Sequence, residues 1–261
     1  MTEKTGRAYI GTSGWNKKQW RPGFYPADLP QRGELGFASQ RLTSIEINST
    51  FYGLQKPSTF ESWRDATPEA FVFAVKGPRV VSRTAFFPTA QLHLDEFFES
   101  GVTALGDKFG PILWQLPDTS KFDAAKVERF MSLLAKYPYR HAIEVRDASY
   151  LDSEFVALLK EHKIAAVFTN EPGAAVFDEP TSDFVYLRLS SGEDQHADGY
   201  DDASIDELAE RINGWRENDL DVFAYFKNPA GLLPHTPHNA TRLIARLEPR
   251  VQARASEPRP D

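Results

Sequence analysis

The sequence predicts a single eight-stranded α/β barrel of the TIM type, a (β/α)8 fold. The chain has 261 residues, and barrels of this type commonly form one unit of about 250 residues. Short β-branched and aromatic runs alternate with segments of helical periodicity, which is the pattern of βαβ units and a parallel sheet. About eight such runs occur, the number that closes a barrel.

The expected strands are short apolar runs bounded by turn-forming residues. Period-two alternation within each run separates a face directed into the barrel from a face directed at the surrounding helices. The runs cover residues 9–12, 43–48, 71–76, 111–116, 141–146, 164–169, 184–189 and 222–227.

The expected outer helices lie between these strands. The strings at 58–61 and 204–207 have the spacing of a capping box and predict helix starts at Ser58 and Ser204. Residues 170–183 are too few and too rich in Gly, Pro and Ala for a normal helix, so we expect an irregular connection after the sixth strand. Apolar residues at helical spacing are Val127, Phe130, Met131 and Leu134 in one segment and Phe155, Leu158 and Leu159 in another.

Composition narrows the class of protein. Hydrophobic residues make up 41% of the chain, and no run approaches the ~20 apolar residues of a membrane span. We find no signal-peptide pattern and no cysteine, so we expect a cytoplasmic protein without disulfides or thiolate chemistry. The net charge of -7 argues against general nucleic-acid binding. The ends, 1–7 and 248–261, are expected to be flexible and leave 8–247 as the barrel; the oligomeric state stays open.

Charged residues concentrate at the C-terminal ends of the expected strands, where a closed parallel barrel builds its site. Alternation places them on inward positions, so we expect them to share one pocket. They are Glu46 and Asn48 on the second strand, Lys76 on the third, Gln115 on the fourth, Glu144 and Arg146 on the fifth, Tyr186 and Arg188 on the seventh, and Lys227 on the eighth.

These residues predict a positive pocket on a negative protein. The cations Lys76, Arg146, Arg188 and Lys227 face the carboxylates Glu46 and Glu144, an excess of two positive charges. Buried ions lose hydration energy, and this cost is offset only when they pair or contact a ligand. A salt-bridge network without a ligand is one alternative. An anionic ligand held by guanidinium groups is favoured.

Six strings occur in order along the chain: GTSGW at 11–15, FYP at 24–26, EINSTFY at 46–52, FVFAVK at 71–76, WQLP at 114–117 and EVR at 144–146. They resemble the motifs of the YecE-like family, the domain of unknown function seventy-two, over nearly the whole chain. This resemblance implies a TIM-type barrel without an established reaction. The matching residues are Ser13, Trp15, Glu46, Asn48, Thr50, Phe51, Tyr52, Lys76, Gln115, Pro117, Glu144 and Arg146.

The second half of the chain departs from the family pattern. Asn170 stands where members tend to show Asp, Ser190 where they show His, and Lys227-Asn228 where a pair of Asn is usual. We therefore expect no role that needs a carboxylate at 170 or an imidazole at 190. The departures indicate a divergent branch with a different substrate.

We expect a metal-independent acid/base enzyme, a hydrolase or an isomerase, acting on a small or chain-end anionic substrate. Glu46 and Glu144 are the expected acid/base pair, with Arg146 keeping Glu144 ionised and the more enclosed Glu46 as the acid. The expected substrate-binding residues are Ser13, Trp15, Asn48, Thr50, Tyr52, Lys76, Gln115, Arg188, Lys227 and Asn228.

No metal and no cofactor are expected. Nucleotide-binding motifs are missing from the sequence, and His235 and His238 lack a third ligand. The alternative to an enzyme is a non-catalytic module that binds a phosphorylated ligand or a nucleic-acid strand.

Overall fold

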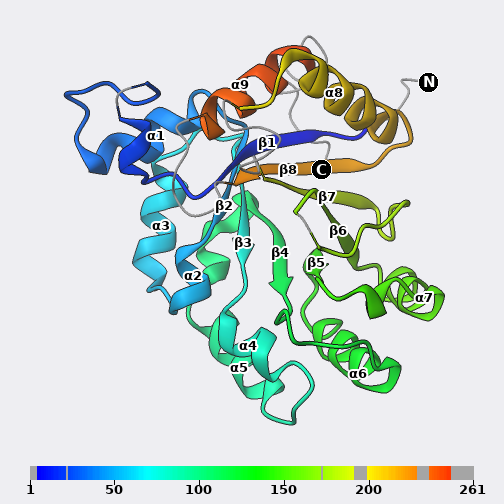
Figure 1. Cartoon of the computed structure of the whole chain (residues 1–261). Helices are drawn as coiled ribbons and strands as arrows, with labels where there is room; N and C mark the ends of the chain where they lie inside the picture. Colours follow the sequence, from blue (N-terminus) through cyan, green and yellow to red (C-terminus); the bar gives the residue numbers. More distant parts are fainter. Residues whose placement is uncertain (1–4, 22, 172, 191–198, 228–234, 248–261) are drawn as a thin grey trace.

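Eight parallel strands form a closed barrel in which each strand pairs with its neighbours in the sequence and the last pairs with the first (Figure 1). The computed structural model describes residues 5–21, 23–171, 173–190, 199–227 and 235–247. The predicted (β/α)8 barrel is confirmed, and every expected strand overlaps an observed one. The strands are β1 (Ala8–Ser13), β2 (Ser44–Ile47), β3 (Val72–Lys76), β4 (Phe109–Gln115), β5 (His141–Glu144), β6 (Ala165–Thr169), β7 (Phe184–Ser190) and β8 (Asp221–Lys227).

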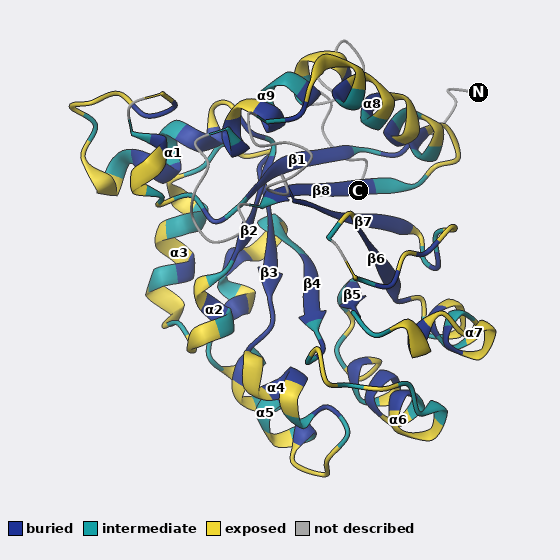
Figure 2. Ribbon diagram, viewed as in Figure 1, coloured by how far each residue is buried: buried dark blue, intermediate teal, exposed yellow. Residues whose placement is uncertain are grey.

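Helices surround the strands, and the helix faces that point away from the barrel are exposed, as the yellow segments in Figure 2 show. The four apolar residues that predicted a helix at 127–134 are all buried, because residues at this spacing share one face. The α-helices are α1 (Glu34–Ser39), α2 (Ser49–Tyr52), α3 (Pro57–Asp65), α4 (Arg79–Thr84), α5 (Ala90–Glu99), α6 (Ala124–Leu134), α7 (Ser153–Glu161), α8 (Asp202–Glu217) and α9 (Thr236–Leu247). The 3-10 segments are η1 (Lys18–Trp20), η2 (Gln31–Gly33), η3 (Val102–Lys108) and η4 (Ala148–Tyr150).

Two helices begin at residues other than those expected. Helix α8 begins at Asp202 and is capped by Asp201, whose carboxylate accepts a hydrogen bond from the backbone N–H of Ser204 at 2.8 Å. Asp201 takes the capping role expected of Ser204, because its carboxylate reaches a free amide of the first turn. Helix α3 begins at Pro57 rather than Ser58, and no side chain caps it.

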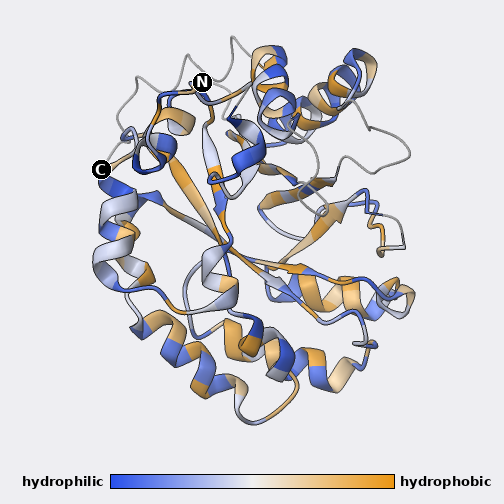
Figure 3. Ribbon diagram, turned by 60° about the vertical axis from the view of Figure 1, so that its left-hand side comes forward, coloured by the Kyte–Doolittle hydropathy of each residue, from blue (hydrophilic) through white to orange (hydrophobic). Residues whose placement is uncertain are grey.

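Two apolar clusters fill the fold. One lies between the strands and the helices, and the other fills the barrel with inward side chains that include Tyr9, Phe184, Tyr186 and Phe223. Hydrophobic residues accordingly recur along both the strands and the helices in Figure 3. The inward positions that follow this inner cluster, at the C-terminal ends of the strands, carry the polar and charged side chains.

The connection between β6 and β7 has no helix in its described residues (Figure 1), as predicted for 170–183. Thr181 fastens it to the barrel. Its hydroxyl accepts from the backbone N–H of Ala166 at 2.8 Å and donates to the carbonyl of Ile164 at 2.7 Å. The connection is therefore anchored to the start of β6 although it is irregular.

The fold includes residues that precede β1. The backbone N–H of Gly6 donates to the carbonyl of Arg216 at 2.9 Å, and that of Arg7 donates to Asp221 at 2.8 Å. The expected flexible end at 1–7 therefore does not extend to these two residues; 1–4 and 248–261 lie outside the described part of the chain. None of the described helices combines the length and the apolar character that crossing a membrane requires.

Candidate active site

The C-terminal ends of the strands bring a set of inward polar side chains together, which we call the mouth. A close approach of β1 and β2 helps to form it, because a Cβ atom at Gly11 would lie 1.7 Å from the carbonyl oxygen of Ser44 and only glycine avoids that contact. Ser13 is thereby paired in register with Glu46. The mouth consists of Ser13, Glu46, Lys76, Gln115, Glu144, Arg146, Arg188 and Lys227, together with Glu171 after β6.

Glu46 is buried and its carboxylate is fully hydrogen bonded. Arg188 donates to both oxygens, from Nε to Oε2 and from Nη2 to Oε1, each at 3.1 Å. Ser13 donates to Oε1 at 2.5 Å and Tyr186 to Oε2 at 2.8 Å. Burial alone would raise the pKa of Glu46, but Arg188 and then Lys76 hold it below its usual value. The ionised form of Glu46 is thereby favoured, whereas the expected role as proton donor needs the protonated form; that role remains a prediction.

Glu144 is also buried but has fewer partners. Arg188 Nη1 donates to its Oε2 at 2.5 Å, and Gln115 donates to its Oε1 at 3.0 Å. Burial raises the pKa of Glu144, yet Arg188 and Lys227 lower it to about 2. Arg146 Nη2 lies 3.8 Å from Oε1. Arg188, rather than the expected Arg146, is thus the main partner that keeps Glu144 ionised.

Glu171 is the functional candidate that sequence reasoning missed. Its Oε1 lies 2.6 Å from Lys227 Nζ, and its Oε2 lies 2.7 Å from Arg146 Nη2. Asp118 lies 3.2 Å from Nε of Arg146. The four cations of the mouth therefore face three carboxylates, or four with Asp118, and the expected excess of two positive charges is wrong. Glu171 follows the strand on the irregular connection, where alternation gives no signal.

Lys76 differs from the other cations of the mouth. Within the described part of the chain it has no carboxylate at ion-pairing distance, and its Nζ lies 3.9 Å from the ring centroid of Phe51. Its side chain is buried, with 8% of the residue exposed. Burial and the charge of Arg188 lower the pKa of Lys76 to about 8, against the attraction of Glu46 and Glu144. This amine therefore titrates closer to neutral pH than an ordinary lysine.

The remaining predicted site residues lie around this centre. Asn48 donates to the hydroxyl of Ser13 at 2.6 Å and so supports the partner of Glu46. The buried Thr50 donates to the carbonyl of Lys76 at 2.7 Å and so positions this backbone; its expected substrate contact remains a prediction. Tyr52 is 77% exposed on α2.

Trp15 packs edge to face on Trp63, with 5.3 Å between ring centroids. The structure shows no contact of Trp15 or Tyr52 with the charged residues of the mouth, so their predicted substrate contacts remain predictions. Asn228 lies outside the described residues. Within the described part of the chain, no group of three or more potential ligands could hold a metal ion.

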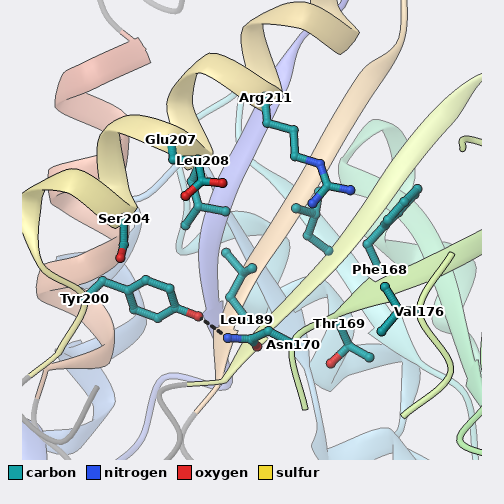
Figure 4. A pocket seen from close by; sticks show the side chains of 11 residues that line it. Phe168, Thr169, Asn170, Val176, Leu189, Tyr200, Ser204, Glu207, Leu208 and Arg211 are labelled. Atoms are coloured by element: carbon teal, nitrogen blue, oxygen red, sulfur yellow. Dashed lines mark hydrogen bonds between the residues drawn. The ribbon is translucent and has the colours of Figure 1, made fainter. Parts of the chain in front are cut away.

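Asn170 and Ser190, two of the expected departures from the family pattern, contact each other. The Asn170 amide donates to the carbonyl of Ser190 at 2.8 Å and to the hydroxyl of Tyr200 at 2.7 Å, and it accepts from the Ser190 N–H at 2.7 Å. Figure 4 shows the bond to Tyr200 at the edge of a cavity. Asn170 therefore links the C-terminal ends of β6 and β7.

This cavity has a volume of about 270 Å³ and lies outside the barrel wall, separate from the mouth. Phe168 and Leu189, which face outward on β6 and β7, line it together with Leu208 and Arg211 of α8 (Figure 4). It lies beside the connection that lacks a helix.

A closed (β/α)8 barrel with a buried ionic centre at the C-terminal ends of its strands defines this chain as a TIM-barrel protein. The chain belongs to the family described as protein of unknown function DUF72, whose sequence pattern matches residues 9–261. The resemblance seen in the motifs is thereby confirmed.

Curated relatives carry names without an activity. The chain is 27% identical to the UPF0759 protein YecE of Escherichia coli K12 over 152 residues, which is 54% of this chain and 49% of that protein. It is 24% identical to the UPF0759 protein YunF of Bacillus subtilis over 161 residues, 56% of this chain and 53% of that protein. The match thus spans about half the length of these relatives.

Solved structures show the same fold. A DUF72 family protein of Thermotoga maritima aligns with a TM-score of 0.76 at 22% identity, covering 93% of this chain and 99% of that one. A second, from Enterococcus faecalis, has a TM-score of 0.69 at 16% identity and covers 94% and 98%. A D-psicose 3-epimerase of Clostridium cellulolyticum reaches 0.52 at 12% identity, covering 94% and 96%. These likenesses concern the fold alone.

Proposed function

We propose that the mouth is the active site of an acid/base enzyme that acts on a small anion. The observation that carries this proposal is the position of Glu171, whose carboxylate lies between Lys227 at 2.6 Å and Arg146 at 2.7 Å. We call these two cations the anion cradle. Two facing cations are the arrangement that binds carboxylate or phosphate, and here the chain's own carboxylate occupies it.

Glu171 does not satisfy all the polar atoms of the cradle, so another anion could bind there more favourably. Its Oε2 and the Nε of Arg146 are both buried and lack a hydrogen bond of good geometry. A buried polar atom without such a bond carries a desolvation cost. A free anion can orient itself in the cradle, whereas Glu171 is constrained by the backbone, so exchange for a substrate anion would relieve that cost.

Two groups of the mouth have pKa values well below their ordinary values. Glu144 is ionised, with a pKa of about 2, while the pKa of Lys76 is about 8. At neutral pH the carboxylate is the group that can accept a proton and the ammonium is the group that can donate one. We assign Glu144 as the proton acceptor and Lys76 as the group that titrates near neutral pH. Proton transfer is the step common to the hydrolase and isomerase alternatives.

Glu46 and Arg188 have a supporting role in this proposal. Every guanidinium nitrogen of Arg188 is bonded to a carboxylate, so the arginine holds the two glutamates in place. The anion is bound by Arg146 and Lys227.

The experiment is a melting panel in phosphate, sulfate and acetate against chloride at matched ionic strength. A ligand at ~100 times its dissociation constant stabilises the native state by about 2.7 kcal/mol, a melting shift of several degrees. Glu171→Gln should enlarge the shift for at least one anion, because it removes the internal competitor. The double variant Arg146→Gln, Lys227→Gln should abolish it.

Glu179→Gln is the matched control. It removes a carboxylate from an exposed ion pair, with Lys160 at 2.9 Å, and should leave the anion response as in the wild type. A panel without any anion-specific shift in Glu171→Gln would contradict the cradle. The same holds if Glu179→Gln responds as strongly as Glu171→Gln, because the effect would then be general to exposed charge.

A further inference from the structure

We infer that Lys76 acts covalently: its amine forms an iminium with the carbonyl carbon of a small anionic aldehyde or ketone. This inference rests on the proposed function, since the anion cradle would hold the charged end of the same molecule. It deepens that function by naming the substrate class, a carbonyl compound that carries a carboxylate or a phosphate.

The geometry around Lys76 supports a reactive amine. Among the described residues its Nζ has no hydrogen bond and no ion pair, and it lies 3.9 Å from the ring centroid of Phe51. Its backbone is held by the hydroxyl of Thr50, at 2.7 Å from the Lys76 carbonyl. An enclosed amine without a hydrogen bond or ion pair among the described residues, at the C-terminal end of a barrel strand, lies where such barrels place their reactive groups.

Burial, assisted by the charge of Arg188, shifts Lys76 toward its neutral form. Arg188 and Lys227 repel an ammonium there and Glu46 and Glu144 attract one, but burial and Arg188 prevail and the pKa falls to about 8. The face of Phe51, 3.9 Å from Nζ, favours the ammonium form and so opposes this shift. A lysine that is desolvated beside another cation is a known form of activated nucleophile.

Lys108 is a useful contrast within the same chain. Burial lowers its pKa as well, but its ammonium donates to the carbonyls of Arg64 at 2.6 Å and Thr67 at 2.7 Å. These bonds occupy the nitrogen. Comparison of Lys76 with Lys108 therefore distinguishes the effect of an unbonded nitrogen on reactivity from the effect of a pKa lowered by burial.

The step balances without an oxidant or a reductant. The lone pair of Lys76 Nζ forms the C–N bond while the C=O π electrons move to the oxygen. That oxygen leaves as water, with one hydrogen from the amine nitrogen and one proton from solvent. The product is a positively charged C=N bond between Lys76 and the substrate carbon. Hydrolysis reverses the sequence and frees the amine.

The test is reductive trapping of the whole chain at neutral pH. The protein is incubated with pyruvate and sodium cyanoborohydride, which reduces the iminium to a stable secondary amine, and labelled lysines are mapped by peptide mass spectrometry. Lys76 should be labelled at least about tenfold faster than the exposed Lys160, because far more of it is neutral at pH 7. Lys108 should label no faster than Lys160.

Lys76→Arg keeps the positive charge and should remove the fast label without adding one elsewhere. Mapping of the wild type gives the result even if this variant does not fold. If Lys76 is labelled no faster than Lys160, the covalent role is overturned.

Acetone distinguishes this inference from the proposed function, since it is pyruvate with a methyl group in place of the carboxylate. Labelling of Lys76 that is fast with pyruvate and slow with acetone supports both the amine and the cradle. Equally fast labelling by both probes supports the amine and contradicts the cradle. An anion-dependent melting shift with no label at Lys76 supports the cradle and overturns the covalent role.

Discussion

Arg188 contacts Glu46 through two of its guanidinium nitrogens, each 3.1 Å from a different carboxylate oxygen. The third nitrogen lies 2.5 Å from Glu144. All three side chains are buried. One guanidinium with a single positive charge therefore bridges two carboxylates from β2 and β5, strands that are not neighbours in the barrel.

Replacement of Arg188 by Met should destabilise the protein by about 3–5 kcal/mol, since it leaves two buried carboxylates without their cation. Urea unfolding at neutral pH measures the loss. Arg140→Met is the matched control. Arg140 also pairs with two carboxylates, Asp183 at 3.0 Å and Asp221 at 2.6 Å, but its side chain is 36% exposed. A loss at Arg140 equal to that at Arg188 would contradict the special role of the buried pair.

The stability provided by Glu144 should depend on pH in the acid range. Its pKa is about 2 in the folded protein and 4.5 ordinarily, so the unfolded chain binds the proton more readily. The stabilisation is then fully present above about pH 4.5 and is lost as the pH falls toward 2. The difference in unfolding free energy between the wild type and Glu144→Gln should shrink across this interval. A difference that is constant with pH would show that Glu144 is not held ionised.

We expect Asn170→Asp, the change toward the residue that the family resemblance implies, to destabilise this chain by about 1–3 kcal/mol. The amide donates to the carbonyl of Ser190 at 2.8 Å, and a carboxylate oxygen there would face that carbonyl without a hydrogen. The loss should be larger at pH 7 than near pH 4, because a protonated carboxyl can donate again. Melting curves at the two pH values measure it, and a variant as stable as the wild type at pH 7 would refute the explanation.

Alternation predicted much of the mouth because it reports which face of a strand a residue occupies. It placed Glu46, Glu144 and Arg188 inward, and the structure joins them. It could not give their partners, since Glu46 and Arg188 meet across the barrel from strands far apart in the sequence. The expected pair of Glu144 and Arg146 is present at 3.8 Å, but Arg188 reaches Glu144 from the seventh strand at 2.5 Å, a closer contact that the spacing within one strand does not reveal.

Glu171 escaped prediction because no strand or helix carries it, and the orientations of Thr50 and Tyr52 escaped prediction although they lie on a helix. Glu171 lies on the irregular connection, where neither strand nor helix spacing sets a direction. Thr50 and Tyr52 share a motif and the short helix α2, yet Thr50 is buried against β3 and Tyr52 is exposed. A motif match identifies residues, while the orientation of the helix decides which of them reach the site.

The position of Glu171 also determines what kind of molecule could enter the mouth. A tethered carboxylate competes with free ligands at an effective concentration on the order of millimolar. A simple monocarboxylate would replace one carboxylate by another and gain little, so abundant small acids would be poor occupants. A molecule that brings a second point of attachment, or a higher charge, would recover the energy of that exchange. If the mouth binds an anion as proposed, the chain's own side chain would therefore select bifunctional anions over simple ones.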